Sequence, residues 1–302
     1  MKTLPLHNES TESTKYLHKG DWLRILVLWL AVMILRYGFF CLLVLASVEV
    51  SFSQNKGMTR SAFQVGEILR YKVKWSFLRL GSLVVQQELA DSTPSRPYRI
   101  ILTAESAQGL PFIDVFFVNR GIVSTETLAG LEFTSDVGKN KESRFVHQID
   151  TSEKTFILTE FKHEQLVHSD TLAMNELTYD DPCLFMLFRC LAGSGETREV
   201  SSVMESRIET TTFRFPVERE EIEVAALDHP INAFRFEGKA NWTRNDYAGL
   251  KGEFCGWVSA DSAAVPLRIE AKIFLGSIVL ELESYERPGW PVRETLFSHV
   301  KK

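Results

Sequence analysis

From residue 63 onward the chain is a succession of short strand-like segments, and this pattern constrains the fold more than any other feature. The run 71–75 (YKVKW) alternates apolar and basic residues with the period of two typical of a half-buried strand. Further strand candidates are 83–89, 98–104, 113–118, 121–128, 142–150, 154–161, 165–172, 211–225, 231–240, 252–260, 264–274 and 276–285. Gly, Asp, Asn and Pro separate them, which predicts an antiparallel meander.

One segment, at about residues 180–192 (DDPCLFMLFRCLA), breaks the strand pattern and predicts a short helix. Asp180 or Asp181 can accept hydrogen bonds from the free N–H groups at its start. Pro182 suits the first turn, and Gly193 suits the C-terminal end. A helix that is apolar on most sides is expected to be covered on most sides, so we predict that it packs against the concave face of the sheet.

The predicted fold is therefore mainly β: a large antiparallel curved sheet or partly open barrel with one short helix, plus an N-terminal hydrophobic leader helix. The predicted divisions are a cytoplasmic extension and leader over 1–53, a linker over 54–62, a single β domain over 63–287 and a C-terminal tail over 288–302.

The leader has the layout of a secretory signal peptide if translation starts at Met33. Arg36 then supplies the positive n-region, 39–48 the apolar h-region, and Ser51-Phe52-Ser53 the small-x-small cleavage site before Gln54. This interpretation predicts an exported or periplasmic protein that is cleaved near Ser53-Gln54.

A retained anchor is the alternative if translation starts at Met1. About residues 22–50 are almost wholly apolar and long enough to cross a bilayer once, which would keep the protein at the inner membrane. Arg36 near the middle of that span would cost about 2.5–3.5 kcal/mol on insertion scales, whereas it is favourable in the n-region.

Composition narrows the classes of partner. The formal net charge is −5 and no basic block stands out, which argues against nucleic acid. Beyond Cys41 in the leader, the chain has Cys183, Cys190 and Cys255, an odd number for an exported protein. Cys183 and Cys190 would lie about 10 Å apart on a helix, too far for a mutual disulfide, so we expect buried free thiols.

No motif for catalysis, a metal or a cofactor stands out. The sequence contains no HExxH, GxSxG or CxxC pattern, so we predict no enzyme activity, no catalytic residue, no metal and no cofactor. Asp180 and Asp181 suit helix capping better than acid–base chemistry. A less favoured alternative is an envelope-polymer hydrolase that uses carboxylates such as Asp246 and Asp261, if the two face one cleft about 5–10 Å apart.

Aromatic residues gather in two places and suggest an apolar binding surface instead. The stretch 110–118 (LPFIDVFFV) and the predicted helix contribute most of them. Excess aromatics in an exported β domain can line a cleft for a lipid-like group, although they can equally fill a core. The candidate ligand-binding residues are Phe112, Phe116, Phe185, Met186 and Phe188.

Three stretches carry a family resemblance: FQVGEILRYKVKW (63–75) followed by LGS (80–82), the DDP-initiated helix up to Arg189, and VSADSAAVPL (258–267) followed by GSI (276–278). In this order and spacing they resemble the bacterial family called domain of unknown function 3108. The resemblance implies an exported, β-rich domain and no assigned catalytic residue. Within the third stretch, Asp261 suits a hairpin turn in which its carboxylate accepts local N–H groups.

The sequence thus predicts an exported cell-envelope protein, more specifically a non-enzymatic binding or carrier module for an apolar or lipid-like ligand. The alternative is a structural or assembly protein that pairs with envelope proteins through a sheet edge. Contact with the membrane is expected through the leader if it is not cleaved.

Overall fold

A computed structural model describes residues 61–90, 98–110, 114–150, 153–173, 177–204, 207–240, 252–273 and 276–290. The predicted leader, residues 54–60 of the predicted linker and the tail beyond Trp290 lie outside these ranges, as do Phe112 and Asp246. Within the described ranges, no helix is long and apolar enough to cross a membrane.

Fifteen strands form one antiparallel sheet around the helix α3 (Asp181–Leu191). The strands are β1 (Ile68–Trp75), β2 (Leu78–Leu89), β3 (Tyr98–Ser106), β4 (Phe116–Val123), β5 (Gly130–Val137), β6 (Ser143–Asp150), β7 (Thr155–Lys162), β8 (Gln165–Ala173), β9 (Thr197–Met204), β10 (Arg207–Arg214), β11 (Arg219–Ile222), β12 (Ile231–Ala240), β13 (Glu253–Ser259), β14 (Pro266–Lys272) and β15 (Ser277–Glu286). The predicted fold class, a large curved antiparallel sheet with one short helix, is confirmed.

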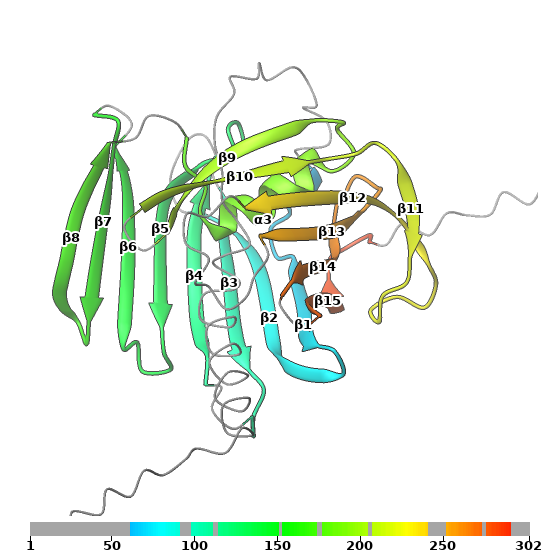
Figure 1. Ribbon diagram of the computed structural model, residues 1–302, viewed down its shortest axis with the longest axis horizontal. Helices are drawn as coiled ribbons and strands as arrows, with labels where there is room; N and C mark the ends of the chain where they lie inside the picture. Colours follow the sequence, from blue (N-terminus) through cyan, green and yellow to red (C-terminus); the bar gives the residue numbers. More distant parts are fainter. Residues whose placement is uncertain are drawn as a thin grey trace, which may run out of the picture.

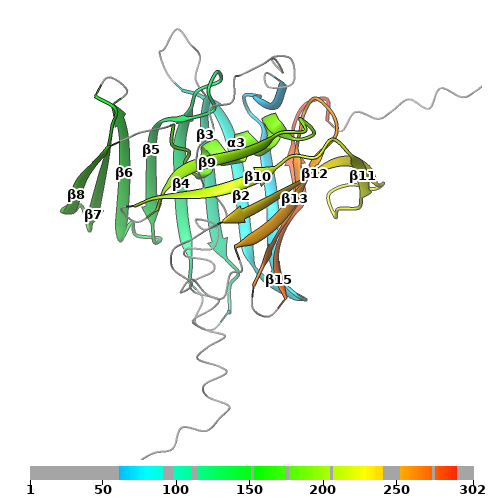
Figure 2. The same cartoon turned by 45° about the horizontal axis from the view of Figure 1, so that its top comes forward.

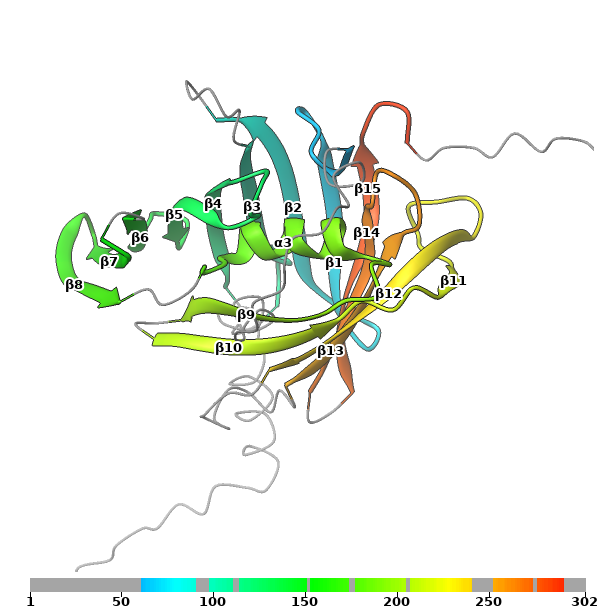
Figure 3. The same cartoon turned by 90° about the horizontal axis from the view of Figure 1, so that it is seen from above.

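Two meanders make up the sheet. Strands β1 to β8 follow one another on one side, β9 to β15 lie on the other, and β1 pairs with β15 in the middle. The short strand β11 lies off this path and pairs with β12. The sheet folds over so that the two halves face each other with α3 between them (Figures 1, 2 and 3).

Local sequence sets the ends of α3. The Asp180 carboxylate accepts a hydrogen bond from the Cys183 N–H at 3.0 Å, and Pro182 occupies the first turn, as predicted. At the other end Gly193 has a φ of +72°, in the left-handed region that favours glycine. A Cβ atom there would also lie 2.6 Å from the Phe234 ring. The helix therefore stops where the chain must turn tightly under a packed aromatic side chain.

Aromatic contacts fix α3 between the two halves of the sheet. Phe188 stacks on Phe236 of β12 and also contacts Phe213 of β10. The Phe185 ring lies edge-on to Tyr71 of β1. All eleven residues of the helix are buried. The concave face of the folded sheet is thus occupied by the protein's own helix.

Several strand boundaries differ from the predicted ones. Strand β4 replaces the two strands expected over 113–118 and 121–128, and β10 and β11 replace the single strand expected over 211–225. Pro216 lies between β10 and β11 and cannot donate to a strand ladder.

Strands β5 and β9 were absent from the sequence prediction, because both are polar. Within β5 the acidic Asp136 is nevertheless buried. Arg120 and Arg144 on the neighbouring strands neutralise its carboxylate at 2.9 and 2.6 Å, and these cross-strand pairs cannot be read from the segment alone.

A buried cluster of charged side chains connects α3 to the residue just before β1. Arg189, with no exposed surface, donates two hydrogen bonds to the Glu67 carboxylate at 2.5 and 3.0 Å. It also donates to the backbone oxygens of Ala263 and Ala264 at 2.8 and 3.0 Å. Arg287 donates to the same carboxylate at 2.5 Å. The polar groups of the cluster therefore satisfy one another inside the core.

Burial opposes ionisation of the Glu67 carboxyl, but the two neighbouring guanidinium groups outweigh it and lower its pKa. Burial likewise opposes the charge on Arg189, and Glu67 outweighs it, so that the arginine pKa is raised. Both groups are consequently charged in the folded protein, and each depends on the other.

Replacing Glu67 with glutamine tests this dependence. E67Q leaves two buried guanidinium groups without their counter-charge, so we expect the free energy of unfolding to fall by about 3–5 kcal/mol. Urea denaturation followed by circular dichroism measures the loss.

The matched control is E286Q. Glu286 pairs with Arg70 at 2.7 Å where both side chains are largely exposed, and such a pair contributes at most about 1 kcal/mol. Equal losses in the two variants would show that the buried cluster does not stabilise the fold.

Candidate functional site

Two adjacent carboxyl groups lie at the start of α3, where Asp181 is buried and Asp180 is partly buried. Asp180 caps the helix, and Asp181 accepts a hydrogen bond from the Asn119 side-chain amide at 2.8 Å. Burial raises the pKa of Asp180 to about 6. Burial, together with the nearby Asp180 charge, raises the pKa of Asp181 to about 8. At neutral pH the Asp181 carboxyl is therefore mostly protonated.

The surroundings of this pair are those of a packed helix end. A Cβ atom on Gly121 would lie 2.8 Å from the Pro182 ring, so β4 approaches the helix closely here. No group of three or more His, Cys, Asp or Glu side chains that could hold a metal ion occurs in the described part of the chain. The pair thus fits the capping role that the sequence favoured.

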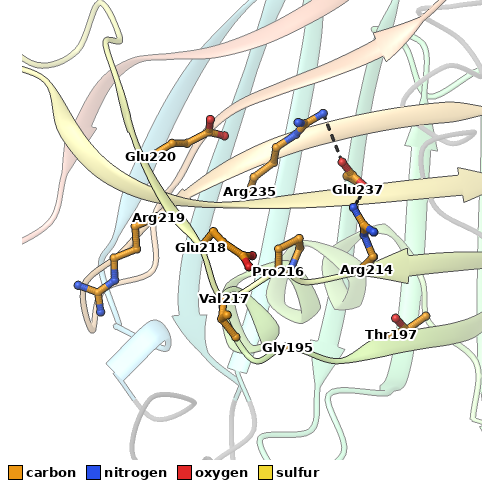
Figure 4. A pocket seen from close by; sticks show the side chains of 10 residues that line it. All are labelled: Gly195, Thr197, Arg214, Pro216, Val217, Glu218, Arg219, Glu220, Arg235 and Glu237. Carbon is orange, nitrogen blue, oxygen red and sulfur yellow. Dashed lines mark ion pairs between the residues drawn. The ribbon is translucent and has the colours of Figure 1, made fainter.

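An open groove of about 690 Å³ lies on the opposite, outer side of the sheet around β11. Figure 4 shows its lining side chains. They come from the start of β9, the end of β10, the 215–218 loop, β11 and β12, and are Gly195, Thr197, Arg214, Pro216, Val217, Glu218, Arg219, Glu220, Arg235 and Glu237.

The charges of this groove largely compensate one another. Its lining carries three arginines and three glutamates, so its formal charge is zero. Arg214 and Arg235 both approach Glu237, at 2.8 and 3.4 Å. Glu220 accepts a hydrogen bond from the Trp257 indole, and Arg235 lies over the Trp257 ring. The groove offers polar contacts, but it has no strong preference for a ligand of either charge.

The third candidate is the free edge of β8. Strands β6, β7 and β8 form a wing that extends beyond α3 (Figures 1 and 3). Among the described residues β8 pairs with β7 alone, and every residue of β8 except Leu172 is exposed. Leu166 and Val167 are exposed by 60% and 50%. A long edge strand with exposed apolar side chains is a template for pairing with another strand.

A small apolar cluster holds the wing in shape. Phe156 and Leu158 are buried with Ile149 and Leu172 packed against them. The His147 ring stacks on Phe133 with 4.6 Å between centroids, and burial lowers its pKa to about 3. This histidine is therefore a neutral core residue.

The opposite edge of the sheet is partly covered. Thr178 forms a parallel bridge to Ser201 of β9, and the Tyr179 N–H donates to the Ser201 oxygen at 2.8 Å. The segment that leads into α3 thus pairs with part of the β9 edge.

The structure does not bring the candidate ligand-binding residues into one site. Phe185, Met186 and Phe188 are buried in the core on α3. Phe116 is only partly buried and points to the other face of β4 from Phe117. Phe112 lies outside the described residues. Ligand binding by this set stays a prediction.

The Asp261 carboxylate is used within its own turn, as the sequence suggested. It accepts hydrogen bonds from the N–H groups of Ala263 and Ala264 at 2.9 and 3.2 Å and from the Trp290 indole at 2.8 Å. Cys183, Cys190 and Cys255 are free; the first two are buried and the third is partly buried.

Comparison with known proteins gives the family. The sequence model described as protein of unknown function (DUF3108) matches residues 70–283 of the 302-residue chain. The chain belongs to the DUF3108 family. No curated protein matches it.

Solved structures give the fold of this DUF3108 protein. A β-barrel-like protein of domain of unknown function DUF1849 from Brucella abortus is similar with a TM-score of 0.50 at 9% identity, covering 74% of this chain and 98% of that one. A protein with a YmcC-like fold from Bacteroides fragilis matches with a TM-score of 0.34 at 11% identity, covering 74% and 97%. At 9% identity the first likeness shows a shared β-barrel-like fold.

The three stretches that carry the family resemblance meet in the buried cluster of the DUF3108 protein. Glu67 belongs to the first, Arg189 to the second, and the oxygens of Ala263 and Ala264 to the third. Arg287 and Gln87 also contact Glu67 and were not foreseen, because nothing in their own segments indicates a buried partner. These contacts give the three stretches a role in holding the fold.

The carboxyl pair at the start of α3 predicts a pH dependence. The raised pKa of Asp181 means that the folded state keeps a proton which the unfolded state releases above about pH 4. That contribution to stability is complete below the unfolded pKa and is lost as the pH rises to about 8. D181N cannot ionise, so between pH 5 and pH 8 wild type should lose up to about 1.4 kcal/mol per pH unit relative to D181N.

Urea midpoints measured across this range provide the test. The control is D114N, which changes a carboxyl group whose side chain is 84% exposed and should parallel wild type. Parallel curves for wild type and D181N would mean that Asp181 is ionised in the folded protein.

Proposed function

We propose that this DUF3108 protein is a non-enzymatic, exported cell-envelope protein that assembles with another polypeptide through the free edge of β8. The observation that carries the proposal is the combination of an exposed strand, whose outer edge has no partner among the described residues, with a concave face that α3 occupies. The secretory leader predicted at the start of the chain supports the cell-envelope location.

The composition of β8 (QLVHSDTLA) supports a role in pairing. The strand has no lysine, arginine or proline, although such residues commonly protect edges from strand addition. The ladder with β7 shifts between Glu160 and Phe161, so Val167 is the extra residue of a bulge, and residues 168–173 remain in regular register. An extended partner strand could continue the sheet along this regular part.

Carriage of an apolar ligand is the alternative, supported by the aromatic run around 112–118. Because Phe185, Met186 and Phe188 pack inside the core, an acyl chain would reach them only after α3 had moved. Native mass spectrometry of protein isolated from its cells distinguishes the two. A second polypeptide favours edge assembly, and a retained lipid favours the carrier.

A double substitution on the edge tests the assembly proposal. The variant L166K/V167K places two charges on exposed positions of β8, where they repel an incoming strand without touching the core. We expect the full-length variant, isolated in mild detergent, to lose the added mass of the wild-type complex. Light scattering after size exclusion gives the mass.

The control is V217K, which changes an equally exposed residue in the charged groove. This variant should keep the complex. An unchanged complex in L166K/V167K, or a wild-type protein without any bound polypeptide, would exclude assembly through β8.

A further inference from the structure

Strand β8 is complementary to itself. If two copies pair antiparallel about a two-fold axis through Ser169, His168 of each copy lies opposite Asp170 of the other. Both residues belong to the part of β8 that is in regular register, beyond the bulge at Val167. An imidazole and a carboxylate that face each other across a ladder can share a hydrogen bond, which stabilises strand pairing.

Neighbouring registers lack this match. An axis through Asp170 sets two carboxylates directly opposite each other, and an axis through His168 sets two imidazoles directly opposite each other. Like charges in directly opposed positions destabilise a pair of strands. Among these three registers, the axis through Ser169 is the one that places each His168 opposite an Asp170.

We propose that two copies of the chain join through β8 in this register. The inference rests on the proposed function and names its partner as a second copy. A two-fold contact uses the same patch on both copies, so complementarity within one strand is sufficient to build it. The resulting sheet would continue from the wing of one copy into the wing of the other.

Within the described ranges no strand lies against the outer edge of β8. Every residue of β8 but Leu172 is exposed, and β8 forms the outermost strand of the wing (Figures 1 and 3). A second chain beside β8 would remove part of the exposed surface of Leu166 and Val167 from water. Pairing would therefore bury apolar surface in addition to forming backbone hydrogen bonds.

A single cysteine at the axis tests the register. In S169C the two substituted positions would face each other with about 4.5–5.5 Å between Cα atoms, within the range for a disulfide. In Q165C the substituted position lies beyond the bulge at Val167, and the two copies of residue 165 are roughly 25 Å apart along the strands. Mild oxidation of the full-length chain should therefore link S169C into covalent dimers and leave Q165C at the wild-type level.

The wild-type chain is the background for this test, because Cys183, Cys190 and Cys255 are already present and free. Dimers of Q165C that form as readily as those of S169C would overturn the register. Failure of S169C to link above the wild-type level would overturn the assignment of a second copy.

Charge exchange supplies an independent test. D170K places a lysine opposite His168 of the second copy, so we expect the dimer to dissociate. The mass measured by light scattering should then be that of a single chain. H168D/D170K restores opposite charges across the axis and should recover the dimer. A dimer that persists in D170K, or a double variant that stays single, contradicts the proposal.

The experiments separate this inference from the function on which it rests. If L166K/V167K loses a complex with a different polypeptide while S169C gives no covalent dimer, assembly through β8 stands and the second copy is wrong. If neither variant affects any complex, both are wrong.

Discussion

The fold depends on burying one cation in the middle of an otherwise apolar helix. Arg189 has no exposed surface, and its charge is tolerated because Glu67 and two backbone oxygens accept its hydrogen bonds. Those partners come from the segment before β1 and from the turn between β13 and β14. Since these partners are far apart in the sequence, satisfying the arginine requires both segments to meet at its guanidinium group. The cluster thereby specifies which segments meet, beyond what burial of apolar surface alone would select.

Local signals were sufficient for the helix and for most strands. Asp180, Pro182 and Gly193 mark the ends of α3 through capping, a fixed φ and a left-handed turn, all of which depend on neighbouring residues only. The alternation in 71–75 likewise reports a half-buried strand. By contrast, β5 is polar and stays a strand because arginines on β4 and β6 neutralise Asp136. Such cross-strand compensation is a property of the assembled sheet.

The buried cluster and the exposed edge of β8 were harder to predict, because both depend on how distant segments are arranged in the sheet. Glu67 and Arg189 are 122 positions apart, and the local sequence around each gives no indication that the two side chains pair. The exposed edge depends on β8 being last in the sheet, which the sequence of β8 does not encode. One signal was available for the aromatic run: adjacent residues of a strand face opposite sides, so Phe116 and Phe117 do not line the same side of the sheet.

The pairing of β1 with β15 has a consequence for how the chain folds. These strands stand side by side in the sheet although they come from the two ends of the described chain, and the Glu67–Arg287 contact next to them spans 220 positions. Contacts of such long range carry a high loop-closure cost and slow the rate of folding. The central ladder cannot close until the last strand has been synthesised. The hairpins from β2 to β8 can form earlier, whereas the junction between the two halves of the sheet is completed last.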